Sequence, residues 1–283
     1  MFNCDAAGHV IHTLPEKEPV FGVTSLDNQL YVLRGSKSSE QVEVYDVDSY
    51  ELLHCLTVPE LDYGTDIAAC AYNRCAYISN SSHNSVHRVA VSGPEAAVTQ
   101  WPVDDKPANL SISVKHGVLV SCWEVRKIKE FGTDGQLLQT VDVPEDFISP
   151  VHTIQLHTGE YIVSHGGLGD PLHRVCRIGS DGQLVKLYGG PKGAGSHQMN
   201  VPVHLSVDRN GFVFVVDLNN HRVLLLSPAL TYIRDVVTWE QLKWRPVRVH
   251  LDVDRQRLYV ADDELKAGSG SYTVGRVVVF SLQ

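Results

Sequence analysis

The chain has 283 residues, of which 43% are hydrophobic and 20% are charged, and its formal net charge is −9 at pH 7. This acidic balance argues against a dedicated nucleic-acid binder, although it leaves room for a local basic face. No stretch approaches the roughly 20 apolar residues that a membrane helix needs. The first residues lack the basic flank and the apolar run of a secretory signal.

The six cysteines are scattered without a Cys-x-x-Cys pair, and four of them lie in or beside apolar runs. We therefore expect buried, reduced thiols rather than disulfides. Together with the absence of a signal or an apolar span, this predicts a cytoplasmic protein without a membrane partner.

Short apolar or alternating segments recur along the whole chain, and helical periodicity is nearly absent. In chain order they include "NQLYVLR" from Asn28, "RCAYISN" from Arg74, "HGVLVSC" from His116, "GEYIVSH" from Gly159, "GFVFVVD" from Gly211 and "QRLYVAD" from Gln256. Gly, Asp, Asn and Ser turns separate these segments, which is the pattern of an all-β protein.

A repeat underlies this pattern, because six segments open with a turn residue and run into a strand. They are "PVFGVTSL" from Pro19, "GTDIAACA" from Gly64, "PANLSISV" from Pro107, "PVHTIQLH" from Pro150, "PVHLSVDR" from Pro202 and "PVRVHLDV" from Pro246. Successive starts lie 43 to 45 residues apart, except for one interval of 52 that contains the loop "YGGPKGAGSHQMN". A period near 44 residues fits the four-stranded blade of a β-propeller.

The N-terminus reads as the end of a repeat, because "FNCDAAGHVIHTL" from Phe2 matches "FGTDGQLLQTV" from Phe131 and "IGSDGQLVKLY" from Ile178. The sixth unit stops at "GRVVVFSLQ", where its third strand should end. We therefore expect residues 9–14 to supply the missing outer strand and residues 1–18 to complete the last blade. The prediction is one domain over residues 1–283: a six-bladed β-propeller of antiparallel blades, its ring closed by the N-terminal strand.

One unit, "VPVHLSVDRNGFVFVVDLNNHRVLLLS" from Val201, resembles an NHL repeat, with its Pro, Asp, Gly and Asn-His-Arg-Val positions. The other five units match mainly in spacing. NHL propellers form the C-terminal domains of animal tripartite-motif proteins, among others, and act there as protein- or RNA-binding platforms. The resemblance therefore implies a binding domain.

The triplet His-Arg-Val occurs at His87, His173 and His221. Its recurrence in hairpins favours a structural role for these histidines over a functional one. We expect Asp217 and Arg222 to pair across their hairpin.

The residue two places after each repeat start should face one mouth of the central channel, because it begins the innermost strand. These ring residues are Phe21, Asp66, Asn109, His152, His204 and Arg248. An alternative register would put His250 rather than Arg248 opposite His204. Loops 34–40, 79–86, 121–125, 164–173, 217–221 and 261–275 should flank the same face, since adjacent strands run antiparallel.

We expect this face to recognise a protein or peptide. We also expect the chain to be a monomeric, non-catalytic scaffold without a cofactor. The sequence contains no nucleophile elbow, phosphate-binding loop or His-Glu-x-x-His motif. An alternative is a metal-dependent lyase or hydrolase, with His152, His204 and Asp66 as the ligand set. Propeller enzymes with channel histidines or a channel calcium provide the analogy for it.

A further alternative is RNA binding. A basic cluster with interleaved tryptophans occupies the last units and comprises Arg234, Trp239, Lys243, Trp244, Arg245, Arg248, Arg255 and Arg257. Stacking on aromatic rings amid positive charge is how single strands are bound. Several aspartates nearby, such as Asp252 and Asp262, would offset the positive field.

Overall fold

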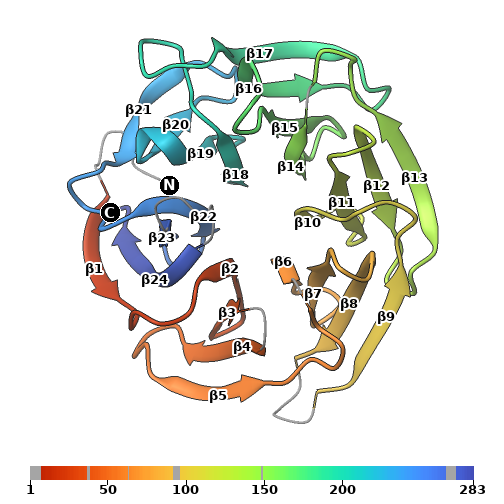
Figure 1. Ribbon diagram of the computed structural model, residues 1–283, viewed down its shortest axis with the longest axis vertical. Coiled ribbons are helices and arrows are strands. Elements are labelled where there is room, and N and C mark those ends of the chain that lie inside the picture. Colours follow the sequence, from red (N-terminus) through yellow and green to blue (C-terminus); the bar gives the residue numbers. More distant parts are fainter. Residues whose placement is uncertain (1–7, 37–38, 63, 92–95, 148, 266–271) are drawn as a thin grey trace.

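The computed structural model describes residues 8–36, 39–62, 64–91, 96–147, 149–265 and 272–283. Six four-stranded antiparallel sheets stand in a ring around a central channel (Figure 1). Blades 1 to 5 follow the chain from β2 to β21, and blade 6 combines β22, β23 and β24 with β1. The predicted six-bladed β-propeller is therefore confirmed.

Each blade places its strands in the same order from the channel to the rim. The innermost strands are β2 (Val20–Leu26), β6 (Gly64–Cys70), β10 (Leu110–Ile112), β14 (Pro150–Gln155), β18 (Pro202–Val207) and β22 (Arg245–Asp252). The second strands are β3 (Gln29–Ser36), β7 (Cys75–Asn80), β11 (Val118–Cys122), β15 (Tyr161–His165), β19 (Val213–Asp217) and β23 (Arg257–Leu265).

The third strands are β4 (Ser39–Asp46), β8 (Ser85–Ala90), β12 (Lys127–Phe131), β16 (Leu172–Ile178), β20 (Arg222–Leu226) and β24 (Tyr272–Ser281). The outermost strands are β5 (Leu52–Leu56), β9 (Val98–Pro102), β13 (Leu137–Asp142), β17 (Leu184–Pro191), β21 (Tyr232–Val237) and β1 (His9–Thr13). Of the described residues, only Leu218–Asn220 form a helical turn. None of the described residues belongs to a helix that is long and apolar enough to span a bilayer.

The side-chain pattern of each strand follows from its place in the blade. Second strands such as β11 and β19 are buried along their whole length, because both faces pack against neighbouring blades. The rim strand β13 has one buried residue, Val141, and is otherwise exposed. The described core residues form apolar clusters that lie between neighbouring blades, and the cluster between blades 6 and 1 also includes Val201 and Leu218 of blade 5.

The N-terminal strand closes the ring as predicted. β1 pairs antiparallel with β24, with His9 opposite Ser281 and Thr13 opposite Val278. Leu14, which follows β1, is fully buried in the cluster between blades 6 and 1. This pairing covers the edge that β24 would otherwise expose.

A one-residue bulge recurs near the start of the innermost strands. It lies between Val20 and Gly22 in blade 1, and at the matching place in blades 2, 4, 5 and 6. Prolines are tolerated here because the inner edge of this strand has no partner that needs an N–H donor. The bulge directs the next side chain into the channel.

The ring of blades has two faces. The linker face carries the connections between blades and the hairpins that join second to third strands. The turn face carries the remaining hairpins. The described cysteines, Cys55, Cys70, Cys75, Cys122 and Cys176, are free, and all but Cys55 are buried; Cys4 lies outside the described residues.

Candidate functional site

One residue from each blade contributes to a layer across the channel, called the channel ring here. In five blades it is the residue directly after the bulge, and in blade 3, where β10 has no bulge, it is Asn109, whose carbonyl accepts from Ser121 N. The members of the ring are Gly22, Asp66, Asn109, His152, His204 and Arg248. Five of the predicted ring residues thus occupy equivalent places, and Arg248 rather than His250 matches His204. The sixth assignment needs a correction: Phe21 is the bulged residue of β2, and Gly22 takes the ring position.

Gly22 stands where no side chain fits. A Cβ atom built on it would lie 2.6 Å from Cγ2 and 2.7 Å from the backbone nitrogen of Ile67 in the neighbouring blade. The guanidinium of Arg248 provides the hydrogen bonds on this side of the channel instead. Its Nε donates to the carbonyl of Phe21 at 2.7 Å, and its Nη2 donates to the carbonyl of Thr65 at 2.7 Å.

Side chains of the ring join neighbouring blades through backbone hydrogen bonds. Asp66 accepts from the N–H of Leu110 at 2.9 Å, and His152 Nδ1 accepts from the N–H of Leu205 at 3.1 Å. Asn109 Nδ2 donates to the carbonyl of Val151 at 2.8 Å. These bonds connect blades 2 to 3, 4 to 5 and 3 to 4.

The next layer along the innermost strands repeats this arrangement at the remaining junctions. Thr24 Oγ1 accepts from Ala69 N at 3.3 Å, and Ser206 Oγ accepts from Leu251 N at 3.1 Å. His250 Nε2 accepts from Ser25 N at 3.1 Å and so joins blade 6 to blade 1. Every junction around the ring therefore carries an inter-blade hydrogen bond from an innermost strand.

The ring also spans the channel. His204 of blade 5 lies with Nε2 at 3.4 Å from Oδ2 of Asp66 in blade 2, and its imidazole stacks on that of His152 at 4.0 Å. Arg248 Nε lies 3.7 Å from Oδ1 of Asp66. Asp66, His152 and His204 are all buried. The predicted ring is thus an internal layer of bonded groups rather than a surface displayed at the channel mouth.

The charge states follow from burial and these partners. Burial opposes ionisation of Asp66, but the hydrogen bond from His204 and the charge of Arg248 outweigh it and hold the pKa of Asp66 below its ordinary value. Burial, with His204 beside it, lowers the pKa of His152 to about 3. Burial also lowers the pKa of His204, against the attraction of Asp66. At neutral pH the ring therefore contains an anionic carboxylate and neutral imidazoles.

The ligand set of the metal alternative does converge, because ligand atoms of Asp66, His152 and His204 all lie within 4.8 Å of one another. However, both nitrogens of His152 are already used. Nδ1 accepts from Leu205, and Nε2, 3.0 Å from the carbonyl of Leu110, must donate to it. A metal ion would have to displace one of these bonds and would add positive charge beside Arg248.

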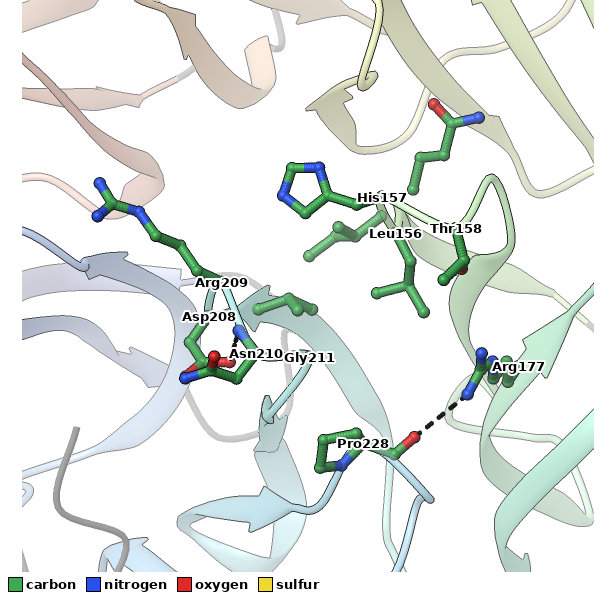
Figure 2. Close-up of a pocket in the computed structure, with 12 residues that line it drawn as sticks. Leu156, His157, Thr158, Arg177, Asp208, Arg209, Asn210, Gly211 and Pro228 are labelled. Atoms are coloured by element: carbon green, nitrogen blue, oxygen red, sulfur yellow. Dashed lines mark hydrogen bonds between the residues drawn. The ribbon is translucent and has the colours of Figure 1, made fainter. Parts of the chain in front are cut away.

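Two adjoining cavities lie on the turn-face side of the ring. The channel itself holds about 240 Å³, and a second cavity of about 250 Å³ lies between the hairpins that follow β14 and β18 (Figure 2). Both have Ile154 and Val207 in their walls. Each is smaller than the ~300 Å³ at which small-molecule sites usually begin.

The polar groups around the second cavity mostly have partners in the protein. Arg177 is bound to Glu160 and also donates to the carbonyl of Pro228 (Figure 2), and Arg209 pairs with Asp254 at 2.6 Å. No sequence motif predicted this cavity. Its only signal is the similar turns after β14 and β18, with Gly159 and Gly211 both at positive φ.

Exposed apolar side chains instead mark the linker face of blades 3 and 4. Trp123 and Val125, in the hairpin between β11 and β12, are 41% and 38% exposed, and Leu168, between β15 and β16, is 68% exposed. We call these three residues the hairpin patch. The flanking loops 121–125 and 164–173 were among those expected on this face. The apolar residues within the text "CWEVR" could have identified the patch, because hairpin turns usually hold polar residues.

The linker between blades 3 and 4 is bonded to both hairpins of the patch. Arg126 Nη1 donates to the carbonyl of Glu145 at 3.0 Å, and Arg174 Nη1 lies 2.7 Å from Oδ2 of Asp146. Gly166 N donates to the carbonyl of Ser149 at 3.4 Å. These bonds hold both hairpins to the same linker.

The residues of the predicted RNA cluster are divided between the two faces. Trp239, Lys243 and Trp244 precede β22 on the linker face, together with Arg245 at its first residue, whereas Arg255 and Arg257 follow its end on the turn face. A strand of this length separates them by roughly 25 Å. Arg248 is in the channel ring, and Arg234 lies in β21.

Most of these cations also have acidic partners. Lys243 pairs with Glu16 at 2.8 Å, Arg255 with Asp252 at 3.1 Å, and Arg257 with Asp48 at 3.1 Å. Trp239 is 68% exposed, but Trp244 is half-buried beneath Lys243 and Arg276.

The expected structural pair in blade 5 is present. Arg222 Nε donates to Oδ2 of Asp217 at 2.9 Å, and His221 adopts the left-handed conformation that turns the chain into β20. His173 lies at the equivalent place in blade 4 and accepts from Val201 N at 2.6 Å. In blade 2 the equivalent residue pair is Asn80 and Ser85, so His87 lies further along β8 than the triplet suggested.

No protein-family model and no curated protein matches this chain. Solved structures match its fold along most of its length. A protein of unknown function from Bacteroides thetaiotaomicron has a TM-score of 0.68 at 12% identity, covering 96% of this chain and 72% of that chain. A streptogramin B lyase has a TM-score of 0.63 at 12% identity, covering 96% of this chain and 88% of that chain. The β-propeller domain of Cps50 (Swd1) from Myceliophteria thermophila has a TM-score of 0.61 at 11% identity, covering 98% of this chain and 100% of that chain. At these identities the likeness is one of fold, and it agrees with the β-propeller architecture.

Proposed function

We propose that the chain is an NHL-type propeller that acts as a non-catalytic scaffold, recognising a protein or peptide partner through its linker face. The observation that carries this proposal is the hairpin patch: Trp123, Val125 and Leu168 are exposed on hairpins of neighbouring blades. Exposed apolar groups in such a setting are the usual mark of an interaction surface. Binding would thus fall on the hairpins rather than on the predicted ring.

The state of the channel ring supports a scaffold over an enzyme. A catalytic base or metal ligand needs a lone pair that is free to act. The His152 nitrogens are both bonded to backbone groups, and Asp66 already accepts from Leu110 and faces Arg248. Of the three residues of the predicted ligand set, only His204 keeps a ring nitrogen, Nδ1, without a hydrogen-bond partner, and one nitrogen does not make a ligand set. A metal-dependent lyase or hydrolase is therefore the weaker proposal, although three of the matched structures are lyases.

RNA binding is also the weaker proposal for the linker face. The basic residues expected to bind it are divided between the two faces, and Lys243 pairs with Glu16. Affinity for RNA depends on several cations reaching phosphates together. The arrangement here favours a protein partner.

The proposal can be tested by selecting ligands from a random peptide display library on the immobilised protein. A Trp123→Ser/Leu168→Ser variant removes the hairpin patch, and Leu137→Ser/Leu138→Ser is the matched control, because these β13 side chains are 45% and 55% exposed. We expect the selected peptides to bind the patch variant at least about tenfold more weakly, equivalent to ~1.4 kcal/mol. Affinity for the control should be unchanged.

Both variants should have the melting temperature of the wild type, because the substituted side chains are exposed. Peptides that bind the patch variant as well as they bind the wild type would contradict the proposal. So would a selection that enriches no peptide dependent on the patch.

A further inference from the structure

The linker between blades 4 and 5 forms one wall of a groove that the proposed function does not use. Its residues 192–201 belong to the segment that lengthens one interval of the repeat, and insertions into repeats often form binding surfaces. Two cavities of about 310 and 360 Å³ lie beside this linker and share Ala194 and Arg222, so they form one continuous groove. Each is larger than the ~300 Å³ at which small-molecule sites usually begin.

Hydrogen bonds hold this wall of the groove in place. Gly193 N donates to the carbonyl of Met199 at 3.0 Å, and the Met199 side chain is fully buried. Blade 5 binds the same segment, because Asn220 Nδ2 donates to the carbonyl of Gly193 and Arg222 Nη2 to that of Gln198, both at 3.0 Å. The groove is therefore formed without a ligand, which lowers the entropic cost of binding one.

Ring side chains line both halves of the groove and reach solvent. Tyr232, at the start of β21, is 42% exposed and lines one half, together with His197, whose ring packs edge-on against Tyr188. Trp239 follows the end of β21, is 68% exposed and lines the other half. Each half thus offers an apolar ring face on which a flat ligand group can stack.

The charges of the groove nearly balance. Of the described residues that line it, Arg222 is the only arginine or lysine, and Arg245 is bound to the adjoining hairpin through Asn219. Three carboxylates stand against these two cations, those of Asp217, Asp235 and Glu240. An anionic ligand would meet Asp235 and Glu240, and a cationic ligand would meet Arg222 where the two halves join. The groove therefore favours a neutral ligand.

The centre of the groove suits hydroxyl groups. Arg222 Nη1 lies 3.5 Å from Oδ2 of Asp235, and the Tyr232 hydroxyl lies 3.3 Å from Oδ1 of the same carboxylate. A donor and an acceptor are thus adjacent, with long contacts between them. Because a hydroxyl both donates and accepts, one ligand hydroxyl can accept from Arg222 while its neighbour donates to Asp235.

We propose that this groove binds a neutral oligosaccharide. The apolar faces of its sugar rings stack on Trp239 and Tyr232, and its neighbouring hydroxyls bond to Arg222 and Asp235. A sugar ring combines adjacent hydroxyls with an apolar C–H face, and the groove offers partners for both. The inference goes beyond the proposed function, because the groove lies between blades 4 and 5 and does not include the hairpin patch.

The first test is the binding of the wild-type protein to an immobilised array of neutral, sialylated and sulfated oligosaccharides. We expect neutral oligosaccharides to bind, and their charged derivatives to bind more weakly. Binding of charged oligosaccharides alone, or of none, would overturn the inference. Neither result bears on the hairpin patch.

The second test locates the site by calorimetric titration with the neutral oligosaccharide that binds best. Trp239→Ser should weaken its binding about tenfold by removing one stacking surface, and Asp235→Asn about three- to tenfold by removing one acceptor. The matched control is Trp123→Ser, which removes a tryptophan that is 41% exposed on blade 3 and should bind as the wild type does. Equal binding by Trp239→Ser and Trp123→Ser would overturn the inference.

The same variant separates this site from the peptide site of the proposed function. Trp239→Ser should keep the melting temperature of the wild type and its affinity for peptides that depend on the hairpin patch. A loss of peptide affinity in this variant, without oligosaccharide binding by the wild type, would assign the groove to a peptide and overturn the inference.

Discussion

Replacing Asp66 with Asn tests the interpretation of the channel ring as a structural clamp. Asparagine preserves the volume but removes the charge that faces Arg248 and replaces one acceptor with a donor. The two carboxylate oxygens accept from the N–H groups of Ile67 and Leu110, both at 2.9 Å. One of these donors would therefore meet an NH₂ group in the variant.

The size of the effect follows from burial. Asp66 is 1% exposed, and breaking a buried ion pair by removing one partner costs about 3–5 kcal/mol. We expect the lower end of this range, because carbonyls of Phe21, Thr65 and Val247 would still bind Arg248. At roughly 2–4 °C per kcal/mol for a chain of about this size, the melting temperature should fall by about 6–12 °C.

Thermal unfolding followed by circular dichroism measures this difference. Asp254→Asn is the control, since Asp254 and its partner Arg209 are 74% and 68% exposed and such pairs contribute less than about 1 kcal/mol. Adding Arg248→Met to Asp66→Asn should recover part of the loss by removing the uncompensated cation. A melting temperature for Asp66→Asn within about 2 °C of the control would refute the reasoning.

Three further predictions concern the packing, charge and closure of the ring. Gly22→Ala should destabilise the fold by about 1–3 kcal/mol in urea unfolding, because its Cβ would collide with Ile67, whereas Gly190→Ala, with no atom within 4 Å, should have little effect. Burial raises the pKa of Asp263 to about 8 from an ordinary value of 3.8, so its contribution to stability is full below pH 4 and is lost as the pH rises toward 8. The unfolding free energy of the wild type relative to Asp263→Asn should accordingly fall between pH 5 and pH 8, and a constant difference would contradict this cause. Removing residues 1–14 should lower the melting temperature and cause aggregation by exposing β24, while Val10→Ser/Ile11→Ser, which keeps the backbone pairing, should not; an unchanged melting temperature after the deletion would contradict ring closure.

The fold could be predicted from the sequence because the number of repeats gives the number of blades and their spacing matches the length of one blade. The sequence also located most of the channel ring. The same bulge follows the start of several innermost strands, so the residue two places after each start is the one directly after the bulge. In blade 1 the count began at Pro19, but β2 begins at Val20. A slip of one residue moves a side chain to the other face of a strand, which is why Phe21 was named instead of Gly22.

The contacts made by the ring could not be read from the sequence in the same way. Asp66 and His204 are 138 residues apart, and their approach depends on how the ring of blades closes. The placement of the RNA cluster could not be read from the sequence for the opposite reason. Its residues are close in sequence, but an extended strand carries Arg245 and Arg255 to opposite faces of the molecule.

The separation of ring and hairpins matters for how variants of this protein should be interpreted. Ring side chains join blades, so a substitution such as Asp66→Asn that weakened binding would report lost stability as readily as lost recognition. The hairpin of Trp123 is held independently of the tryptophan, because its ends, Cys122 and Lys127, are paired and Ile128 is buried. Trp123 can therefore be removed without loosening the strands that present it. A binding defect in Trp123→Ser, at unchanged melting temperature, would thus reflect the linker face itself.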